Sequence, residues 1–171
     1  PRRFGKSLLI STLDAYFSGK KELFKGLKIE ELEKEWIEYP VFRIDFARGD
    51  YNDPQELEKI LEEHLCEWEK KYGKDENYTT LSGRFMYLLK TAHENTKYKA
   101  VVLIDEYDKP MLDVLGTGLE EKNRNTLKGF YGAFKSADAH LRFVFLTGVT
   151  KFSQISVFSG FNQPKDISMD S

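Results

Sequence analysis

The unbroken apolar run at positions 100–104 limits the fold of this chain more than any other part of its sequence. Such runs are typical of strands that are buried on both faces, as in parallel sheets. Residues 40–46 and 141–146 are two further strand candidates. Apolar residues at helical spacing lie at positions 8–17, 57–68, 81–92 and 127–134. Because the strands alternate with helices, the sequence predicts the α/β class with a mainly parallel sheet.

Length and composition limit the number of domains, the cellular location and the partners that we expect. The chain has 171 residues, so we expect residues 1–171 to form one domain. Its 26 basic and 28 acidic residues nearly cancel, so the whole molecule has no strong attraction for nucleic acid or an anionic membrane. A single cysteine, Cys66, excludes an internal disulfide, and no apolar run approaches the roughly 20 residues of a membrane helix. We therefore expect a cytoplasmic protein without a membrane partner.

The first candidate motif is Gly5, Lys6 and Ser7, the end of the phosphate-loop pattern G-x-x-x-x-G-K-[ST]. Glycine lets backbone amides curl around phosphates, lysine reaches the β and γ phosphates, and the serine hydroxyl ligates magnesium. The apolar helix expected from Leu8 onward supplies the context that this motif requires. The triplet alone is a weak signal, since an exposed turn at a chain end is an equally good explanation.

The second motif is the pair of acids, Asp105 and Glu106, that follows the apolar run. A buried strand delivers such carboxylates to the C-terminal edge of the sheet, where ligands bind in open α/β proteins. Asp105 is a candidate to hold magnesium, and Glu106 to orient and deprotonate water. This is what a Walker B strand looks like, and together the two motifs favour a nucleotide site over a solvated acidic turn.

Polar residues at the end of the last expected strand form a third element. Thr147, Thr150 and Lys151 are candidates to sense the γ-phosphate, although a polar loop closing a buried strand explains them equally well. Arg2 and Arg3 lie within the phosphate loop, where arginine contacts phosphates or carboxylates. The sequence favours neither partner for them.

Three segments together resemble the AAA-ATPase-like proteins of bacteria: residues 1–8 (PRRFGKSL), 103–110 (LIDEYDKP) and 147–153 (TGVTKFS). The resemblance covers essentially the whole chain. It implies a three-layer P-loop NTPase fold in which Asp105 and Glu106 are the Walker B pair. It also implies that ATP and Mg²⁺ are the ligands, with Ser7 and Asp105 at the metal. The residues expected to contact ATP are Arg3, Phe4, Gly5, Lys6, Ser7 and Leu8.

The resemblance also implies parts that this chain lacks. We expect it to be a fragment, truncated before the first strand of the sheet, without the helical lid and without the C-terminal PD-(D/E)XK nuclease-like domain that usually follows. The wider ATPase class carries an additional strand in the sheet. Here that strand would begin at residue 107 or, as the better choice, be the final strand 141–147.

The leading hypothesis is Mg²⁺-dependent ATP hydrolysis that drives or gates the nuclease-like effector domain. A nucleotide-binding switch or scaffold with little hydrolysis is the alternative. A GTPase is disfavoured because the sequence has no Asn-Lys-x-Asp motif, whereas a small-molecule kinase uses the same phosphate loop and stays open. Assembly into a homo-oligomer, the source of any arginine finger and contact with nucleic acid are also left open.

The histidines, the cysteine and one Glu-x-Lys triplet are better explained by structural roles than by metal binding or catalysis. His64, His93 and His140 are far apart in sequence and show no metal-ligand spacing. Cys66 lies within an expected helix, where packing explains it. Glu69 begins a Glu-x-Lys triplet on the same helix, which favours a solvated helix face over a nuclease site.

Overall fold

A computed structural model describes residues 5–149, 165 and 167 of the chain. Within these residues no helix is both long enough and apolar enough to cross a membrane. The elements are, in chain order, α1 (Lys6–Phe17), η1 (Lys21–Phe24), α2 (Lys28–Leu32), β1 (Val41–Asp45), α3 (Glu56–Tyr72), α4 (Leu81–Thr96), β2 (Ala100–Asp105), α5 (Lys109–Leu112), α6 (Gly118–Ser136), η2 (Asp138–His140) and β3 (Leu141–Leu146).

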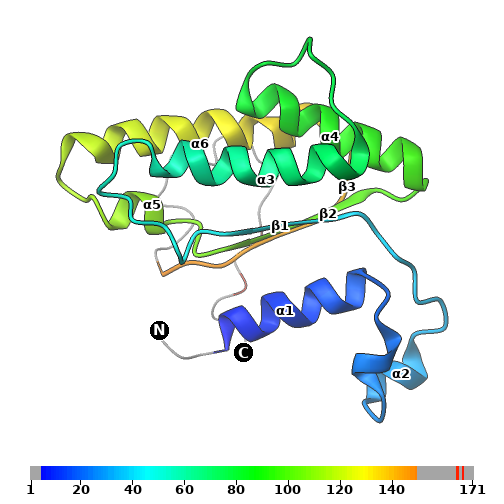
Figure 1. Ribbon diagram of the computed structural model, residues 1–171. Helices are drawn as coiled ribbons and strands as arrows, with labels where there is room; N and C mark the ends of the chain where they lie inside the picture. Colours follow the sequence, from blue (N-terminus) through cyan, green and yellow to red (C-terminus); the bar gives the residue numbers. More distant parts are fainter. Residues whose placement is uncertain (1–4, 150–164, 166, 168–171) are drawn as a thin grey trace.

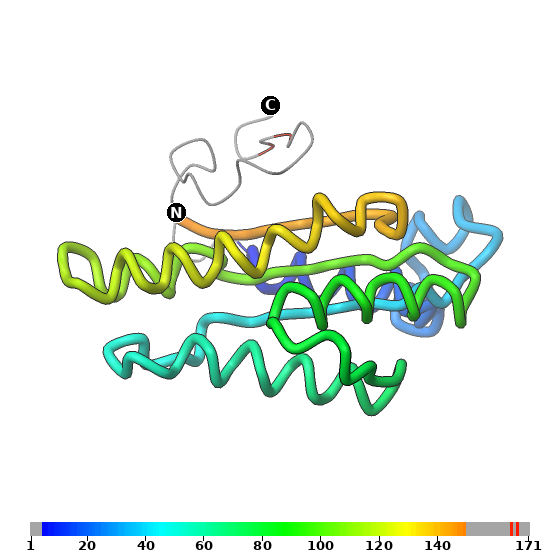
Figure 2. Tube along the Cα trace, turned by 90° about the horizontal axis from the view of Figure 1, so that it is seen from above, coloured from blue at the N-terminus to red at the C-terminus, as the bar shows by residue number. Residues whose placement is uncertain are grey.

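The three strands form one parallel sheet in the order β1-β2-β3. Figure 2 shows them side by side, with β2 in the centre. All six residues of β2 are buried, which explains why this strand is apolar almost throughout. The structure therefore confirms the α/β class and the parallel sheet expected from the sequence.

Helices cover both faces of the sheet, so the chain is built in three layers (Figure 1). Helices α3, α4 and α6 cover one face, and α1 lies against the other. Alternate strand residues divide between these faces. Phe42, Val102 and Ile104 belong to the larger core beneath α3, α4 and α6. Val101 and Leu103 pack with Ile10 of α1 in the smaller core. The arrangement is that of a P-loop-like α/β/α fold.

One expected strand is not formed, and one helix extends beyond the apolar residues that predicted it. The possible strand from residue 107 onward is wrong, because residues 109–112 form helix α5. Of the two alternatives for the additional strand, residues 141–146 form a strand, β3, which pairs with β2. Helix α6 begins well before residue 127, because Thr117 caps it by accepting a hydrogen bond from the Leu119 N–H at 3.2 Å.

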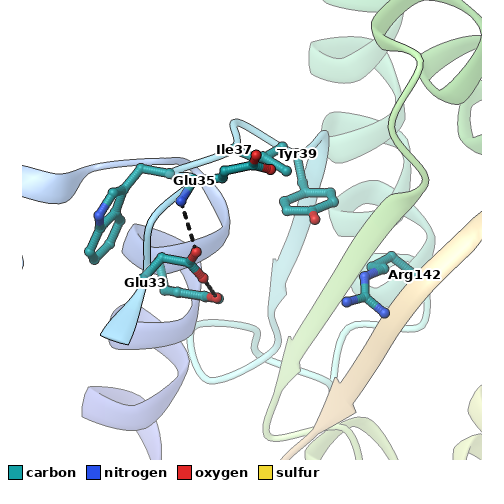
Figure 3. Close-up of a pocket in the computed structure, with 7 residues that line it drawn as sticks. Glu33, Glu35, Ile37, Tyr39 and Arg142 are labelled. Carbon is teal, nitrogen blue, oxygen red and sulfur yellow. Dashed lines mark hydrogen bonds between the residues drawn. The ribbon is translucent and has the colours of Figure 1, made fainter. Parts of the chain in front are cut away.

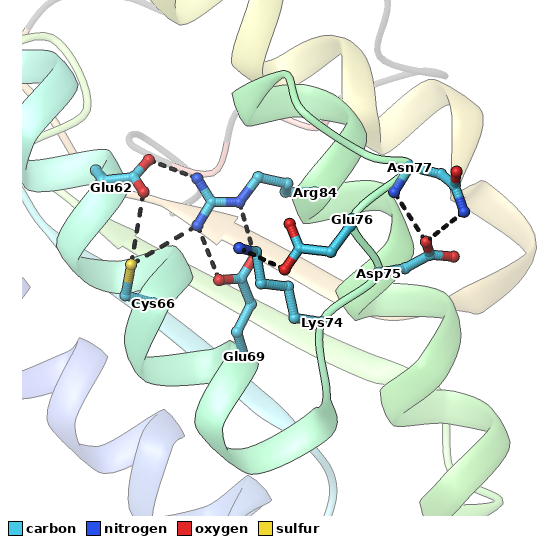
Figure 4. A network of polar contacts seen from close by, with 8 residues as sticks. All are labelled: Glu62, Cys66, Glu69, Lys74, Asp75, Glu76, Asn77 and Arg84. Atoms are coloured by element: carbon cyan, nitrogen blue, oxygen red, sulfur yellow. Dashed lines mark hydrogen bonds and ion pairs between the residues drawn. The ribbon is translucent and has the colours of Figure 1, made fainter.

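Helices α3 and α4 are joined by a largely buried ion pair (Figure 4). The Arg84 guanidinium donates two parallel hydrogen bonds to Glu69, at 2.7 and 2.8 Å. The side chains of both residues are about nine-tenths buried. Glu62 accepts a third hydrogen bond from Arg84 at 2.5 Å. The expectation of a solvated Glu69 is therefore wrong, because an arginine one helix away satisfies its carboxylate.

Candidate functional site

Three polar residues lie in a row at the C-terminal edge of the sheet. Asp45 and Asp105 are register partners at the ends of β1 and β2, and Thr147 directly follows β3. Their alternation with Val101, Leu103 and the other residues of the smaller core places all three on the face covered by α1. The C-terminal edge of a parallel sheet is where open α/β proteins bind ligands.

Helix α1 begins beneath this edge. Gly5, the residue before the helix, has φ 75°, a left-handed conformation that glycine adopts without strain. Gly5 has no side chain to cap the helix, so the first N–H groups have no acceptor from the cap residue. Arg43 of β1 anchors the helix through Asp14, with 3.3 Å between guanidinium and carboxylate. An uncapped N-terminus held at the edge of a sheet is suited to binding phosphate.

Lys6 reaches from α1 to both acidic and carbonyl oxygens at this edge. Its Nζ lies 3.3 Å from Oε1 of Glu106 and donates a hydrogen bond to the Gly148 carbonyl at 3.1 Å. The glycine is 142 residues away in the sequence. The fold therefore brings the first and third sequence motifs into direct contact with the second.

Glu106 turns the chain sharply at the end of β2. Its φ is 55°, a conformation that costs a residue other than glycine about 1–3 kcal/mol. Its carbonyl accepts a hydrogen bond from the Lys109 N–H at 3.0 Å, at the start of α5. Strain of this kind persists where the surrounding contacts demand it, and it points the glutamate side chain at Lys6 instead of continuing the strand.

Thr147 is buried beside the two acids, with 6% of its surface exposed. Its hydroxyl donates a short hydrogen bond to Oδ1 of Asp105 and accepts one from the Glu106 N–H at 3.3 Å. The candidate sensor is therefore in contact with the candidate magnesium ligand.

The segment that follows Thr147 packs tightly on the turn after β2. The fully buried Asp108 accepts a hydrogen bond from the Val149 N–H at 2.9 Å. A Cβ placed on Gly148 would lie 2.5 Å from the Tyr107 ring and 2.7 Å from Oδ1 of Asp108. Only glycine fits at this position without movement of its neighbours.

The loop after β1 completes this edge of the sheet. The Lys109 ammonium lies 5.2 Å from the centre of the Tyr51 ring, pairs with Asp113, and contacts the Gly49 carbonyl at 3.4 Å. Burial raises the pKa of Tyr51 above its ordinary value, and its hydroxyl donates to the Phe46 carbonyl at 2.8 Å. Lys109 therefore contacts the loop after β1 and Asp113, whereas Lys6 pairs with Glu106.

A separate polar pocket of about 160 Å³ lies near the opposite end of the strands (Figure 3). It is formed around the end of α1, the segment before β1 and the start of β3. The Tyr16 hydroxyl donates to Glu33 there at 2.5 Å, and Arg142 lies on its far side. None of the sequence-predicted site residues lines this pocket.

The structure thus gathers Lys6, Asp105, Glu106 and Thr147 at one edge, with Gly5 and Ser7 at the adjoining helix start. Exposed Leu8 lies in the first turn of the same helix. The other predicted site residues, Arg3, Phe4, Thr150 and Lys151, lie outside the described residues, as does Arg2.

Sequence reasoning missed Asp45 and gave Asp108 no role. Asp45 ends an apolar strand as Asp105 does, and that repeated strand-then-acid pattern was the available signal. No local sequence pattern indicated the burial of Asp108, because that burial depends on the loop after β3.

His93 and His140, distant in sequence, also lie in contact, with 2.9 Å between their Nδ1 atoms.

Comparison with known proteins shows the family to which the chain belongs. The model of the family described as predicted AAA-ATPase matches residues 1–158. The chain belongs to this family. A protein of Azotobacter chroococcum mcd 1, named as an uncharacterized protein in the vnfD 5' region, is 42% identical over 172 residues. That match covers 100% of this chain and 33% of the relative, so the chain spans about a third of that protein's length. No solved structure shows a significant match.

Membership in the AAA-ATPase-like family supports ATP binding and an ATPase-like function. The donor set at the sheet edge fits the magnesium ion that normally accompanies ATP. Mg²⁺ prefers oxygen ligands and takes one or two from the protein, with water and phosphate completing its shell. Asp105 and Ser7 supply a carboxylate and a hydroxyl. Within the described part of the chain, no group of three or more His, Cys, Asp or Glu side chains could hold a metal ion.

Proposed function

We propose that this chain binds ATP with Mg²⁺ at the C-terminal edge of its sheet and hydrolyses it. The observation that carries the proposal is the contact of Lys6 with Glu106 and Gly148, because it joins all three sequence motifs in one site. Membership in the AAA-ATPase-like family supports the same conclusion independently.

We assign each residue of the site a role in this reaction. The backbone from Arg3 to Leu8, with the N-terminus of α1, binds the phosphates, and Lys6 pairs with the β and γ phosphates. Ser7 and Asp105 hold the magnesium ion, which neutralises phosphate charge during the reaction. Glu106 orients a water molecule and accepts its proton as the water attacks the γ-phosphate. Thr150 and Lys151 remain candidates to contact that phosphate.

A second function, a nucleotide-binding switch with little hydrolysis, is favoured by one specific observation. Glu106 is paired with Lys6, so the carboxylate proposed as the general base is engaged by a lysine. If the pair persisted after ATP bound, the site would bind nucleotide without activating water. Steady-state release of inorganic phosphate distinguishes the two functions.

The test of nucleotide binding is calorimetry on the full-length protein with ATP and Mg²⁺. Lys6→Ala should weaken binding by about 10- to 100-fold, because a hydrogen bond to a charged group contributes about 1.5–3 kcal/mol. Lys25→Ala, at an exposed lysine of the η1–α2 connection, is the matched control and should bind as the wild type does. Equal affinity of the Lys6 variant and the wild type would refute the site.

We also propose that ATP binding gates further domains of the full-length protein, including a nuclease-like domain after this chain. The family resemblance and the length of the Azotobacter relative support this proposal.

Self-assembly would allow a neighbouring subunit to supply an arginine to the site. Sedimentation with and without ATP tests this assembly. An unchanged sedimentation coefficient would leave the source of that arginine within one chain.

A further inference from the structure

The hydroxyl of Thr147 has partners both as a donor and as an acceptor. A threonine hydroxyl has a single proton, and here that proton is donated to Oδ1 of Asp105. The same oxygen accepts a hydrogen bond from the N–H of Glu106 at 3.3 Å. Thr147 and Asp105 have only 6% and 3% of their surfaces exposed, so solvent offers little substitute for either contact.

The backbone of Thr147 also forms hydrogen bonds with the turn at the end of β2. Its N–H donates to the Ile104 carbonyl at 2.9 Å, and its carbonyl accepts from the Tyr107 N–H at 2.9 Å. One residue of the segment after β3 thus contacts four successive residues, 104–107, at the end of β2. Among them is Glu106, whose positive φ needs support from its surroundings.

We propose that Thr147 is a positioning residue for the magnesium ligand Asp105 and for the turn that carries Glu106. The proposal rests on the function proposed above and adds a role to it. The hydroxyl fixes one oxygen of the Asp105 carboxylate and the amide of Glu106. Residues that hold a metal ligand in this way raise metal affinity, because the ligand loses less freedom on binding.

The same contacts argue against direct sensing of phosphate by this hydroxyl. To donate to a phosphate oxygen, it would have to withdraw its proton from Asp105. A buried carboxylate oxygen would then lose its donor, at a cost of about 1–3 kcal/mol. Acting on the nucleotide through Asp105 avoids that cost.

The test compares ATP affinity with Mg²⁺ and with EDTA, by calorimetry on the full-length protein. Thr147→Val has the same shape but no hydroxyl, and Thr147→Ser keeps the hydroxyl. The valine variant should lose about 10- to 100-fold of the gain in ATP affinity that Mg²⁺ produces, while its affinity in EDTA stays unchanged. The serine variant should restore the gain. In an Asp105→Asn background the valine substitution should add little, since the two residues act as one unit.

Several results would overturn the proposal. A general loosening of the fold would weaken binding equally with and without Mg²⁺. A true phosphate sensor would leave the Mg²⁺ dependence intact and lose the discrimination between ATP and ADP. Thr147→Ala, which leaves space in place of the methyl and hydroxyl groups, supplies the same measurement if the valine variant does not fold. Failure of the wild type to bind ATP would instead refute the proposed function, and it is seen before any variant is compared.

Discussion

The Nζ of Lys6 lies 3.3 Å from Oε1 of Glu106, so the lysine proposed to hold phosphate is paired with the proposed general base. Both side chains are only about a quarter exposed. Phosphate groups that enter the site compete with this carboxylate for the lysine. If ATP binds as proposed, its phosphates would release Glu106 from Lys6, and the substrate would free the base that acts on it.

Glu106→Gln should separate binding from hydrolysis. The amide keeps the size of the side chain but neither holds Lys6 by charge nor accepts a proton, so ATP should bind at least as tightly as it does to the wild type. Hydrolysis should fall about 10²- to 10⁴-fold, the usual contribution of a general base. Calorimetry and phosphate release measure the two effects. Glu121→Gln, on the exposed side of α6, is the control, and undiminished turnover in the Glu106 variant would disprove its assigned role.

Gly148→Ala should disturb the site without removing any of its functional groups. The added methyl would lie 2.5 Å from the Tyr107 ring, and forcing an atom into a packed region costs about 1–3 kcal/mol. The displaced carbonyl would also lose its hydrogen bond from Lys6. Chemical denaturation and ATP affinity should both report the change.

Gly132→Ala is the matched control for that substitution. Gly132 lies within α6 with no atom within 4 Å of an added Cβ, so alanine should stabilise the helix by about 0.5–1 kcal/mol. A Gly148 variant as stable as the Gly132 variant would show that the loop after β3 is loosely packed.

Arg84→Met should destabilise the α3–α4 pair strongly. It leaves the buried Glu69 carboxylate without its guanidinium, and breaking a buried pair in this way costs about 3–5 kcal/mol. The lost contact with the half-exposed Glu62 should matter little. The double variant Arg84→Met with Glu69→Leu removes both charges and should recover most of the loss in urea denaturation. Equal stability of the single and double variants would contradict a buried Glu69 charge.

Acidification should destabilise the fold through its histidines. Burial, together with nearby His93, lowers the pKa of His140 below 6.5, and burial lowers that of His64 in the same direction. As the pH falls through 6.5, the unfolded chain takes up protons that the folded chain does not, so folding stability decreases. The urea midpoint should therefore be lower at about pH 5.5 than at about pH 7.5. His140→Gln should reduce the difference, and a midpoint that rises on acidification would contradict it.

The sequence predicted those elements whose apolar pattern and functional residues lie next to each other in the chain. The apolar run of β2, followed by two acids, could be assigned because a strand that is buried on both faces has few alternative explanations. Helix α1 was predicted from the helical spacing of the apolar residues that begin at Leu8. Both signals lie in adjacent residues, so no knowledge of distant contacts was needed.

The rest depended on contacts between distant segments. The burial of Glu69 follows from Arg84 on the next helix, and the meeting of His93 with His140 follows from the path into β3. The engagement of Thr147 with Asp105 requires the register between β2 and β3. A single sequence does not reveal such pairings, because each partner alone has an ordinary interpretation.

The contact between Lys6 and the Gly148 carbonyl spans 142 residues, which has a consequence for the order of events during synthesis. The ribosome makes helix α1 first, and the loop that receives its lysine follows after roughly 7–28 s at typical rates of translation. During that interval the nascent chain has the lysine but not its carbonyl partner. An interrupted or prematurely terminated chain that ends before β3 therefore cannot assemble this site.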